Sequence, residues 1–234
     1  MSICRNHFDR IRAAREAETT PTAVPGATAP GTMADKMLKL IAMHRAALKA
    51  IKSRLAKIAA KATFLPEYTA YVDGVVAAGK GGQDDVLVTV MLWRLDTGDF
   101  EGALALAAYA LRHDLAMPDF IARDLPTTVV EEIADAALAE LDRADADTVN
   151  PEPIREALDL TAECDMPDEV RAKAHKALGL ILTATAPEAA LEHLASALEL
   201  DAGCGVKTKL NALRKAQGKA EPNEKTEPTD PAGS

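Results

Sequence analysis

The chain of 234 residues is long enough to bury one sizeable core and still carry an appended arm. Apolar residues make up 48% but aromatic residues only 3%, a composition that favours closely packed helices over a β-sheet. The scarcity of aromatic residues also argues against binding single-stranded nucleic acid by base stacking. The net charge of −9 hides a division, because residues 1–61 carry +8 and the remainder carries −17. The basic segment therefore predicts either a polyanionic partner or docking onto the chain's own acidic body.

Cellular location can also be predicted from the sequence. The cysteines Cys4, Cys164 and Cys204 have no disulfide spacing, which fits a reducing cytosol. No apolar stretch follows the N-terminal arginines, as a signal peptide would require, and the longest dense apolar run, residues 86–92, is too short to cross a bilayer. We expect a soluble cytoplasmic protein with no membrane partner.

Residues 1–33 are predicted to be a flexible arm and linker. Four arginines precede a stretch rich in Pro, Gly, Ala and Thr at residues 19–32: Arg5, Arg10, Arg12 and Arg15. Residues 34–63 then predict one long basic helix, because Thr32 and Asp35 have capping-box spacing and nothing downstream breaks the pattern. Such a helix would be about 40 Å long.

Two faces of this predicted helix point to different partners. Its apolar positions follow a heptad pattern that predicts a coiled coil and a homo-oligomer: Met37, Ile41, His44, Leu48, Ile51, Leu55, Ile58 and Ala62. Its cations have no acid after Asp35: Lys36, Lys39, Arg45, Lys49, Lys52, Arg54, Lys57 and Lys61. Parallel copies would repel each other unless DNA phosphates or the acidic body screened these charges, and we favour DNA.

Residues 64–216 predict an acidic all-α domain of helical hairpins. Helices are expected at 66–79, 83–96, 99–114, 127–163 (broken at Asn150 and Pro151), 168–183, 187–200 and 206–216. Two of the hairpins have tetratricopeptide-like spacing, with Gly98, Ala103 and Ala110 in the first and Gly179, Ala190 and Ala197 in the second. A plain helical bundle is the alternative. Residues 217–234 predict a disordered tail.

Carboxylates near residues 84–99 invite comparison with a metal-dependent nuclease. Asp84 and Asp85 belong to the first turn of a predicted helix, whereas Asp96 and Asp99 lie at its far end, about 18 Å away. They cannot hold one ion within a single copy, so we interpret them as caps and turn residues. A site completed between subunits stays open as an alternative.

Other motifs predict no chemistry. The GKGG run at residues 79–82 lacks phosphate-loop spacing and is interpreted as a helix cap. Residues 66–97 have a helix-turn-helix outline, but the second helix begins with acids and carries Arg94 alone as a base. Cys4 and His7 lack a second ligand pair, and His175 and His193 are interpreted as partly buried histidines. We predict no catalytic residue, no metal and no cofactor.

Two blocks of sequence resemble a known family. The small terminase subunit of cohesive-end tailed phages is similar to two runs of this chain: GKGGQDDVLVTVMLWRLDTGDFEGALALAAYAL at residues 79–111 and CDMPDEVRAKAHKALGL at 164–180. A weaker similarity extends over residues 33–213. The resemblance implies a protein that binds double-stranded viral DNA at the packaging site and loads it onto the large ATPase and nuclease subunit. It also implies a host cytoplasmic location. The family is also credited with endonuclease activity. The alternatives are a helical adaptor that does not bind DNA and an endonuclease subunit.

Overall fold

The computed structural model describes residues 31–119 and 121–218, and every regular element in those ranges is helical. This confirms the predicted all-α class. The elements in chain order are α2 (Met33–Ala50), α3 (Arg54–Phe64), the 3₁₀ turn η1 (Leu65–Glu67), α4 (Thr69–Ala78), α5 (Asp85–Thr97), α6 (Phe100–Arg112), α7 (Leu125–Leu141), the 3₁₀ turn η2 (Ala146–Thr148), α8 (Glu152–Leu160), α9 (Asp168–Ile181), α10 (Pro187–Leu200) and α11 (Lys207–Ala216). The predicted arm with Arg5, Arg10, Arg12 and Arg15, and all but two residues of the predicted tail, lie outside the described residues.

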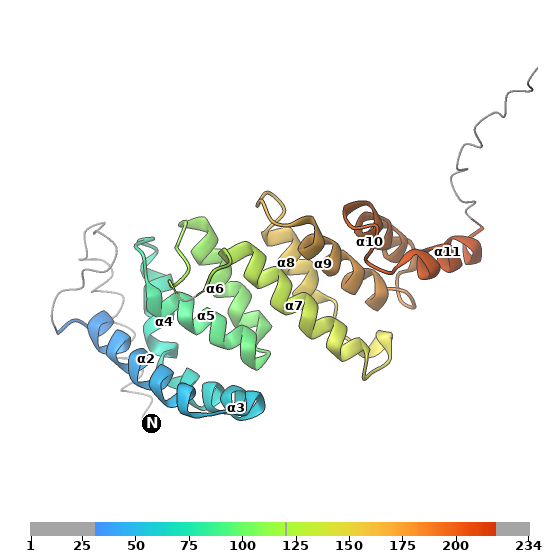
Figure 1. Ribbon diagram of the computed structural model, residues 1–234. Coiled ribbons are helices and arrows are strands. Elements are labelled where there is room, and N and C mark those ends of the chain that lie inside the picture. Colours follow the sequence, from blue (N-terminus) through green and yellow to red (C-terminus); the bar gives the residue numbers. More distant parts are fainter. Residues whose placement is uncertain (1–30, 120, 219–234) are drawn as a thin grey trace, which may run out of the picture.

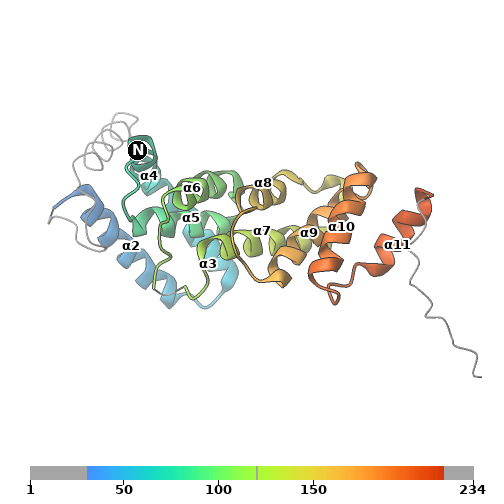
Figure 2. The same ribbon diagram turned by 90° about the horizontal axis from the view of Figure 1, so that it is seen from above.

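The helices form an elongated row in which neighbours in sequence are mostly neighbours in space. Helices α2 and α4 lie at one end of this row and α11 lies at the other, in both views (Figures 1 and 2). One large apolar cluster runs from α2 to α10, and a smaller one joins α10 to α11. Among the described residues no helix is long and apolar enough to cross a membrane.

The single helix predicted over residues 34–63 is wrong, because the chain breaks between α2 and α3. Ile51 is extended, with φ −88° and ψ 124°, and its N–H donates to the carbonyl of Leu48. Ser53 then starts α3 as its N-cap, its hydroxyl accepting from Ala56 N at 3.2 Å. The cap that the sequence predicted at Thr32 is confirmed, with Thr32 Oγ1 accepting from Asp35 N at 3.1 Å.

The predicted heptad face of α2 is buried inside the same chain. Ile41, His44 and Leu48 are 5 to 8% exposed and belong to the core side of the helix, and α2 and α3 both pack on α5. Leu55, at the next heptad position in α3, is 78% exposed. The break rotates the second half of the pattern away from the first, so one continuous coiled-coil seam does not form. Self-association of the chain stays a prediction.

The body is built from helical hairpins at the predicted places. Helices α5 and α6 meet across Gly98, whose left-handed φ of 79° ends α5. Helices α9 and α10 form the other close pair, where Gly179 lies against Leu194. The small residues predicted to allow close approach are fully buried: Ala103, Ala110, Ala190 and Ala197. The hairpins are present, and their relation to tetratricopeptide repeats stays a prediction.

Helix boundaries differ from prediction mainly in the segment after Phe64. Pro66 lies in the 3₁₀ turn η1, and α4 begins only at Thr69, before ending at Gly79 with a left-handed φ of 63°. The predicted break at Asn150 and Pro151 is confirmed, since α8 starts at Glu152. Each confirmed boundary carries a local signal in the sequence, a proline, a glycine or a capping side chain.

Candidate nucleic-acid interface

Four cations surround the junction between α2 and α3, and we call this group the basic elbow: Lys49, Lys52, Arg54 and Lys57. The first three are exposed and Lys57 is half-buried. None of the four forms an ion pair or side-chain hydrogen bond with any residue in the described ranges. The extended segment at residues 51–53 carries Lys52 outward between two helix ends. The elbow therefore presents several uncompensated positive charges around one junction.

The other predicted cations of this segment have different surroundings. Lys36 is exposed, and Lys39 is exposed but donates to Asp35 at 2.7 Å. Arg45 is half-buried. Lys61 is only 17% exposed and pairs with Asp96 of α5, so its charge is already balanced by the body. For Lys61 the structure therefore favours the reading in which a cation docks onto the chain's own acids.

An aromatic cluster fixes the elbow to the body. The rings of His44 and Phe64 stack with centroids 3.8 Å apart and an interplanar angle of 4°. His44 Nδ1 lies 2.8 Å from Tyr68 Oη, and the Tyr68 ring meets Trp93 edge-on at 5.7 Å. Residues from α2, α3 and α5, with Tyr68 between η1 and α4, thus share one cluster, which orders the backbone on both sides of the elbow. Cations held on an ordered support lose less conformational entropy when they bind a ligand.

Burial sets the protonation states in this cluster. Desolvation lowers the pKa of His44 below its ordinary value, although the charge of Glu67, whose carboxylate lies 3.8 Å away, opposes the shift. Desolvation, followed by the same glutamate, raises the pKa of Tyr68. At neutral pH an uncharged imidazole and an intact phenol therefore share the buried hydrogen bond. The cluster serves to pack and position, and the charge of the surface comes from the elbow.

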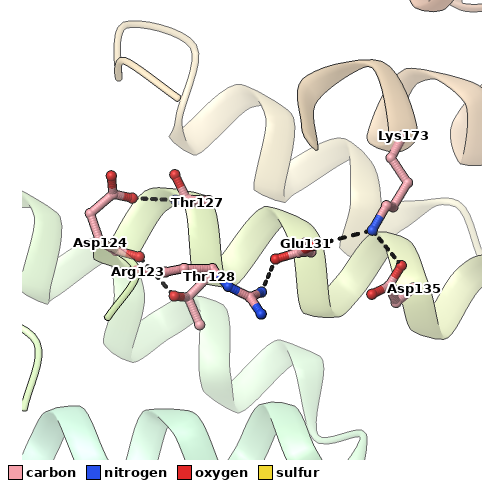
Figure 3. Close-up of polar contacts among 7 residues, drawn as sticks. All are labelled: Arg123, Asp124, Thr127, Thr128, Glu131, Asp135 and Lys173. Atoms are coloured by element: carbon pink, nitrogen blue, oxygen red, sulfur yellow. Dashed lines mark hydrogen bonds and ion pairs between the residues drawn. The ribbon is translucent and has the colours of Figure 1, made fainter. Parts of the chain in front are cut away.

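Many cations of the body, in contrast, are paired with the body's own acids. Arg123, in the segment before α7, pairs with Glu131 of α7 (Figure 3). Lys173 of α9 lies 3.3 Å from Glu131 and 2.9 Å from Asp135, so it bridges α9 to α7. Asp124 starts α7 by accepting from Thr127 N at 2.9 Å. This network joins three segments of the acidic body and leaves these two cations little free charge to offer a phosphate.

The carboxylates considered for a nuclease have structural contacts. Asp84 is the N-cap of α5, accepting from Leu87 N at 2.9 Å and from Tyr71 Oη at 2.6 Å, and burial raises its pKa. Asp85 is exposed in the first turn, Asp96 pairs with Lys61, and Asp99 caps α6 through Gly102 N. The interpretation as caps and turn residues is confirmed for Asp84 and Asp99. Within the described ranges no three His, Cys, Asp or Glu residues are grouped to hold a metal.

The bend itself is the feature of this surface that sequence reasoning missed. Heptad counting carried the helix through residues 51–53 because Ile51 fits an apolar position and Lys52 suits the polar face. The sequence signal for a new helix start was Ser53, because serine is a strong N-cap residue. Its side chain accepts a hydrogen bond from the N–H of Ala56, three positions later. Because of the bend, the cations on the two helices surround one junction and do not form a straight line.

Comparisons with known proteins identify the family of this chain. The family model described as phage small terminase subunit matches residues 38–169, which include the elbow and most of the acidic body. A protein named "Terminase, endonuclease subunit", from Escherichia phage P2, is 43% identical over 226 residues, covering 96% of this chain and 89% of that protein. No solved structure matches the chain. Because the family model matches more than half of the chain and this relative is 43% identical over most of it, the chain belongs to the phage small terminase subunit family.

Proposed function

We propose that this chain binds double-stranded viral DNA through the basic elbow and delivers it to the large terminase subunit for cutting and packaging. The observation that supports the proposal is a group of cations without internal partners, on an ordered support, in a member of this family. The DNA partner, the large subunit and action in the host cytoplasm are all parts of this proposal.

Electrostatics determine how the DNA approaches. Duplex DNA carries about one negative charge per 1.7 Å of its axis, and each neutralised phosphate releases counterions. The body beyond residue 64 is strongly acidic, so a duplex is repelled from it and attracted to the elbow. Contacts to phosphates set orientation and carry no sequence information. Base preference then requires a separate contact, for which the arginine arm with Arg5, Arg10, Arg12 and Arg15 is the candidate.

The decisive experiment compares the full chain with the variant Lys49→Gln/Lys52→Gln/Arg54→Gln. The affinity of each protein for duplex DNA is measured at salt concentrations from about 50 to 300 mM, because electrostatic binding to DNA weakens steeply over this range. Each lost phosphate contact lowers the slope of log affinity against log salt by about 0.9, so the slope falls by up to about 3. A matched control is Lys80→Gln/Arg112→Gln/Arg143→Gln, which removes three exposed cations elsewhere.

Point variants are preferable to deletion of the first 63 residues, because the deletion would remove His44 and uncover Phe64 and Trp93. Equal affinity and slope for the elbow variant and the unmodified chain would refute the assignment. The helical adaptor that contacts an acidic protein would then be the better description. Comparison of the packaging-site duplex with a scrambled duplex, for the chain with and without its arm arginines, tests whether the arm reads sequence.

The name of the P2 relative favours a second candidate, an endonuclease whose metal site is completed between subunits. The test is Mg²⁺-dependent cleavage of the packaging-site duplex by the purified chain alone. Asp85→Ala is the informative variant, since Asp85 is exposed, whereas Asp84→Ala removes a helix cap and lowers stability. Cleavage that is lost with Asp85→Ala at unchanged stability would support this candidate. No cleavage by the chain alone would assign cutting to the large subunit.

A further inference from the structure

A cleft of about 440 Å³ opens into the body at a place that the proposed function does not use. Its walls come from three helices that are far apart in sequence, with Lys61 from α3, Trp93 from α5 and Glu132 from α7. Both α3 and α7 pack on α5, which therefore lies between them. Protein pockets that bind small ligands usually enclose roughly 300–1,000 Å³, so this cleft is large enough for a small organic group.

The two cations that line the cleft already have carboxylate partners. Lys61 pairs with Asp96, which also lines the cleft, and Arg123 pairs with Glu131 of α7 (Figure 3). Glu132, in contrast, is half-buried and lines the cleft, but it forms no ion pair or side-chain hydrogen bond with any residue of the described ranges. The charged side chain of the cleft that lacks a partner is therefore a carboxylate, and a complementary ligand carries a positive charge.

A buried hydroxyl group in the same cleft also lacks a partner. Thr89 of α5 is only 3% exposed and lines the cleft, yet its Oγ1 forms no hydrogen bond with a described residue. The hydroxyl of Thr128, on the same cleft, is satisfied, because it donates to the carbonyl of Asp124 at 2.7 Å (Figure 3). Thr89 Oγ1 is not sealed in the core, as the unpartnered hydroxyl of Thr127 is, so a ligand in the cleft can reach it. Because buried polar groups are normally hydrogen-bonded, this hydroxyl indicates a ligand with a polar hydrogen.

The rest of the lining shows what carries the positive charge. Leu92, Trp93, Leu95 and Ile121 give the cleft a largely apolar wall. Within the described ranges no three His, Cys, Asp or Glu residues are grouped to hold a metal ion, so a bare divalent cation fits this lining poorly. A cation on an aliphatic stem fits better, because the stem packs against the apolar wall while the charged head meets a carboxylate. An aromatic ring such as that of Trp93 also attracts a nearby cation.

We propose that this cleft binds an alkylammonium or alkylguanidinium group. The charged head pairs with the Glu132 carboxylate, the Thr89 hydroxyl accepts from an N–H of the ligand, and the stem lies against Leu92 and Trp93. Two sources carry this chemistry: a free aliphatic amine, and an arginine side chain from residues 1–20 of the same chain. A ligand that contacts α3, α5 and α7 together stabilises the packing of α3 on the body. The site is separate from the basic elbow and does not depend on DNA binding.

Trp93 reports occupation of the cleft, because it is the single tryptophan of the chain. The test titrates the full chain with diaminobutane at constant ionic strength and follows Trp93 fluorescence and the thermal midpoint. A ligand that binds the folded state raises that midpoint. We expect a saturable change in fluorescence and a higher midpoint. Butanediol, which has the same stem but no charge, should produce neither.

Three variants assign the contacts. Glu132→Gln should weaken the affinity for diaminobutane by roughly tenfold or more, because a charge-assisted hydrogen bond is lost. Thr89→Val keeps the shape of the side chain and removes the hydroxyl, so the affinity should fall by roughly two- to tenfold. Glu140→Gln removes an exposed carboxylate of α7 outside the cleft and should leave the affinity unchanged. Unfolding cannot imitate these losses, because Glu132 and Thr89 have no internal partner to lose and the midpoint without ligand should not fall.

The variant Arg5→Gln/Arg10→Gln/Arg12→Gln/Arg15→Gln distinguishes the two sources. If an arginine of the chain itself fills the cleft, this variant changes Trp93 emission without added ligand and binds diaminobutane more tightly than the unmodified chain. If the ligand is a free amine, emission and affinity stay the same. Equal responses to diaminobutane and butanediol in both proteins would overturn the inference, as would an unchanged affinity in Glu132→Gln. None of these measurements involves DNA, so their failure would leave the proposed function standing.

Discussion

The contact between Gly179 and Leu194 yields the sharpest prediction about the fold. Adding a methyl group at Gly179 would place its Cβ 2.8 Å from Leu194 Cγ, 2.9 Å from Cδ2 and 3.1 Å from the Leu194 backbone nitrogen. Leu194 is fully buried, so its side chain cannot swing into solvent. Because one of the three atoms is backbone, helix α10 must move away from α9 to accommodate Gly179→Ala.

The net effect is a balance of two terms. Alanine is a better helix former than glycine by about 1 kcal/mol, which by itself would stabilise α9. Overpacking of a close-packed interface costs about 1–3 kcal/mol. We therefore expect Gly179→Ala to destabilise the chain by about 1 kcal/mol, which for a chain of this size lowers the melting temperature by about 2–4 °C.

Urea and thermal unfolding, followed by circular dichroism, measure this effect. The matched control is Gly102→Ala in α6, where the new Cβ would meet only the ends of the Arg94 and Asp99 side chains. Those side-chain ends can shift, but moving the Asp99 carboxylate weakens its cap on Gly102 N, which offsets the gain in helix propensity of about 1 kcal/mol. Gly102→Ala should therefore be about neutral. Leu194→Ala should cost less in the Gly179→Ala background than alone, because the methyl group occupies part of the cavity. A Gly179→Ala protein as stable as the Gly102→Ala protein would refute the close packing of α9 on α10.

Three further outcomes are expected. Phe64→Ala removes the ring stacked on His44 and should lower the free energy of unfolding, measured with urea, by about 2–3 kcal/mol. Leu55→Ala, at an exposed site of the same helix, should change that free energy by less than about 0.5 kcal/mol. Gly98→Ala forces a left-handed φ of 79° on alanine and should cost about 1 kcal/mol by the same assay; no loss would contradict the C-cap. Burial lowers the pKa of His175 to about 4, so the unfolded chain takes up the proton first and stability falls as pH drops from 6.5 toward 4. After allowance for partial exposure, we expect the free energy of unfolding at pH 5 to be about 1 kcal/mol lower than at neutral pH. His175→Gln should flatten that pH dependence.

Local signals were sufficient to predict most helix boundaries of the body. Gly79, Gly98, Asp84 and Asp99 end or start helices in the structure, and each acts through its own backbone or a neighbour within a few residues. Such effects are encoded in adjacent positions, so they can be recognised without knowing the fold.

The candidate surface was predictable only in part. The cations of the elbow could be counted from the sequence, but their partners could not. Lys61 and Asp96 are 35 residues apart and form an ion pair, whereas Lys49 and Lys52 remain unpaired. Which charges stay free depends on which segments meet, and this is set by burial of distant apolar groups.

The amino-acid sequence by itself determined that the chain is helical, that it divides into a basic segment and an acidic body, and that it belongs with the small terminase subunits. These properties depend on composition, on local capping and on the similarity of short runs of sequence to a known family. Only the tertiary structure decided that the apolar face of α2 is covered by α5 of the same chain and that the predicted long helix bends at Ile51 to Ser53. The heptad pattern specifies which side of a helix must be buried, but the partner that buries it is chosen by contacts between residues far apart in sequence, such as His44 with Trp93.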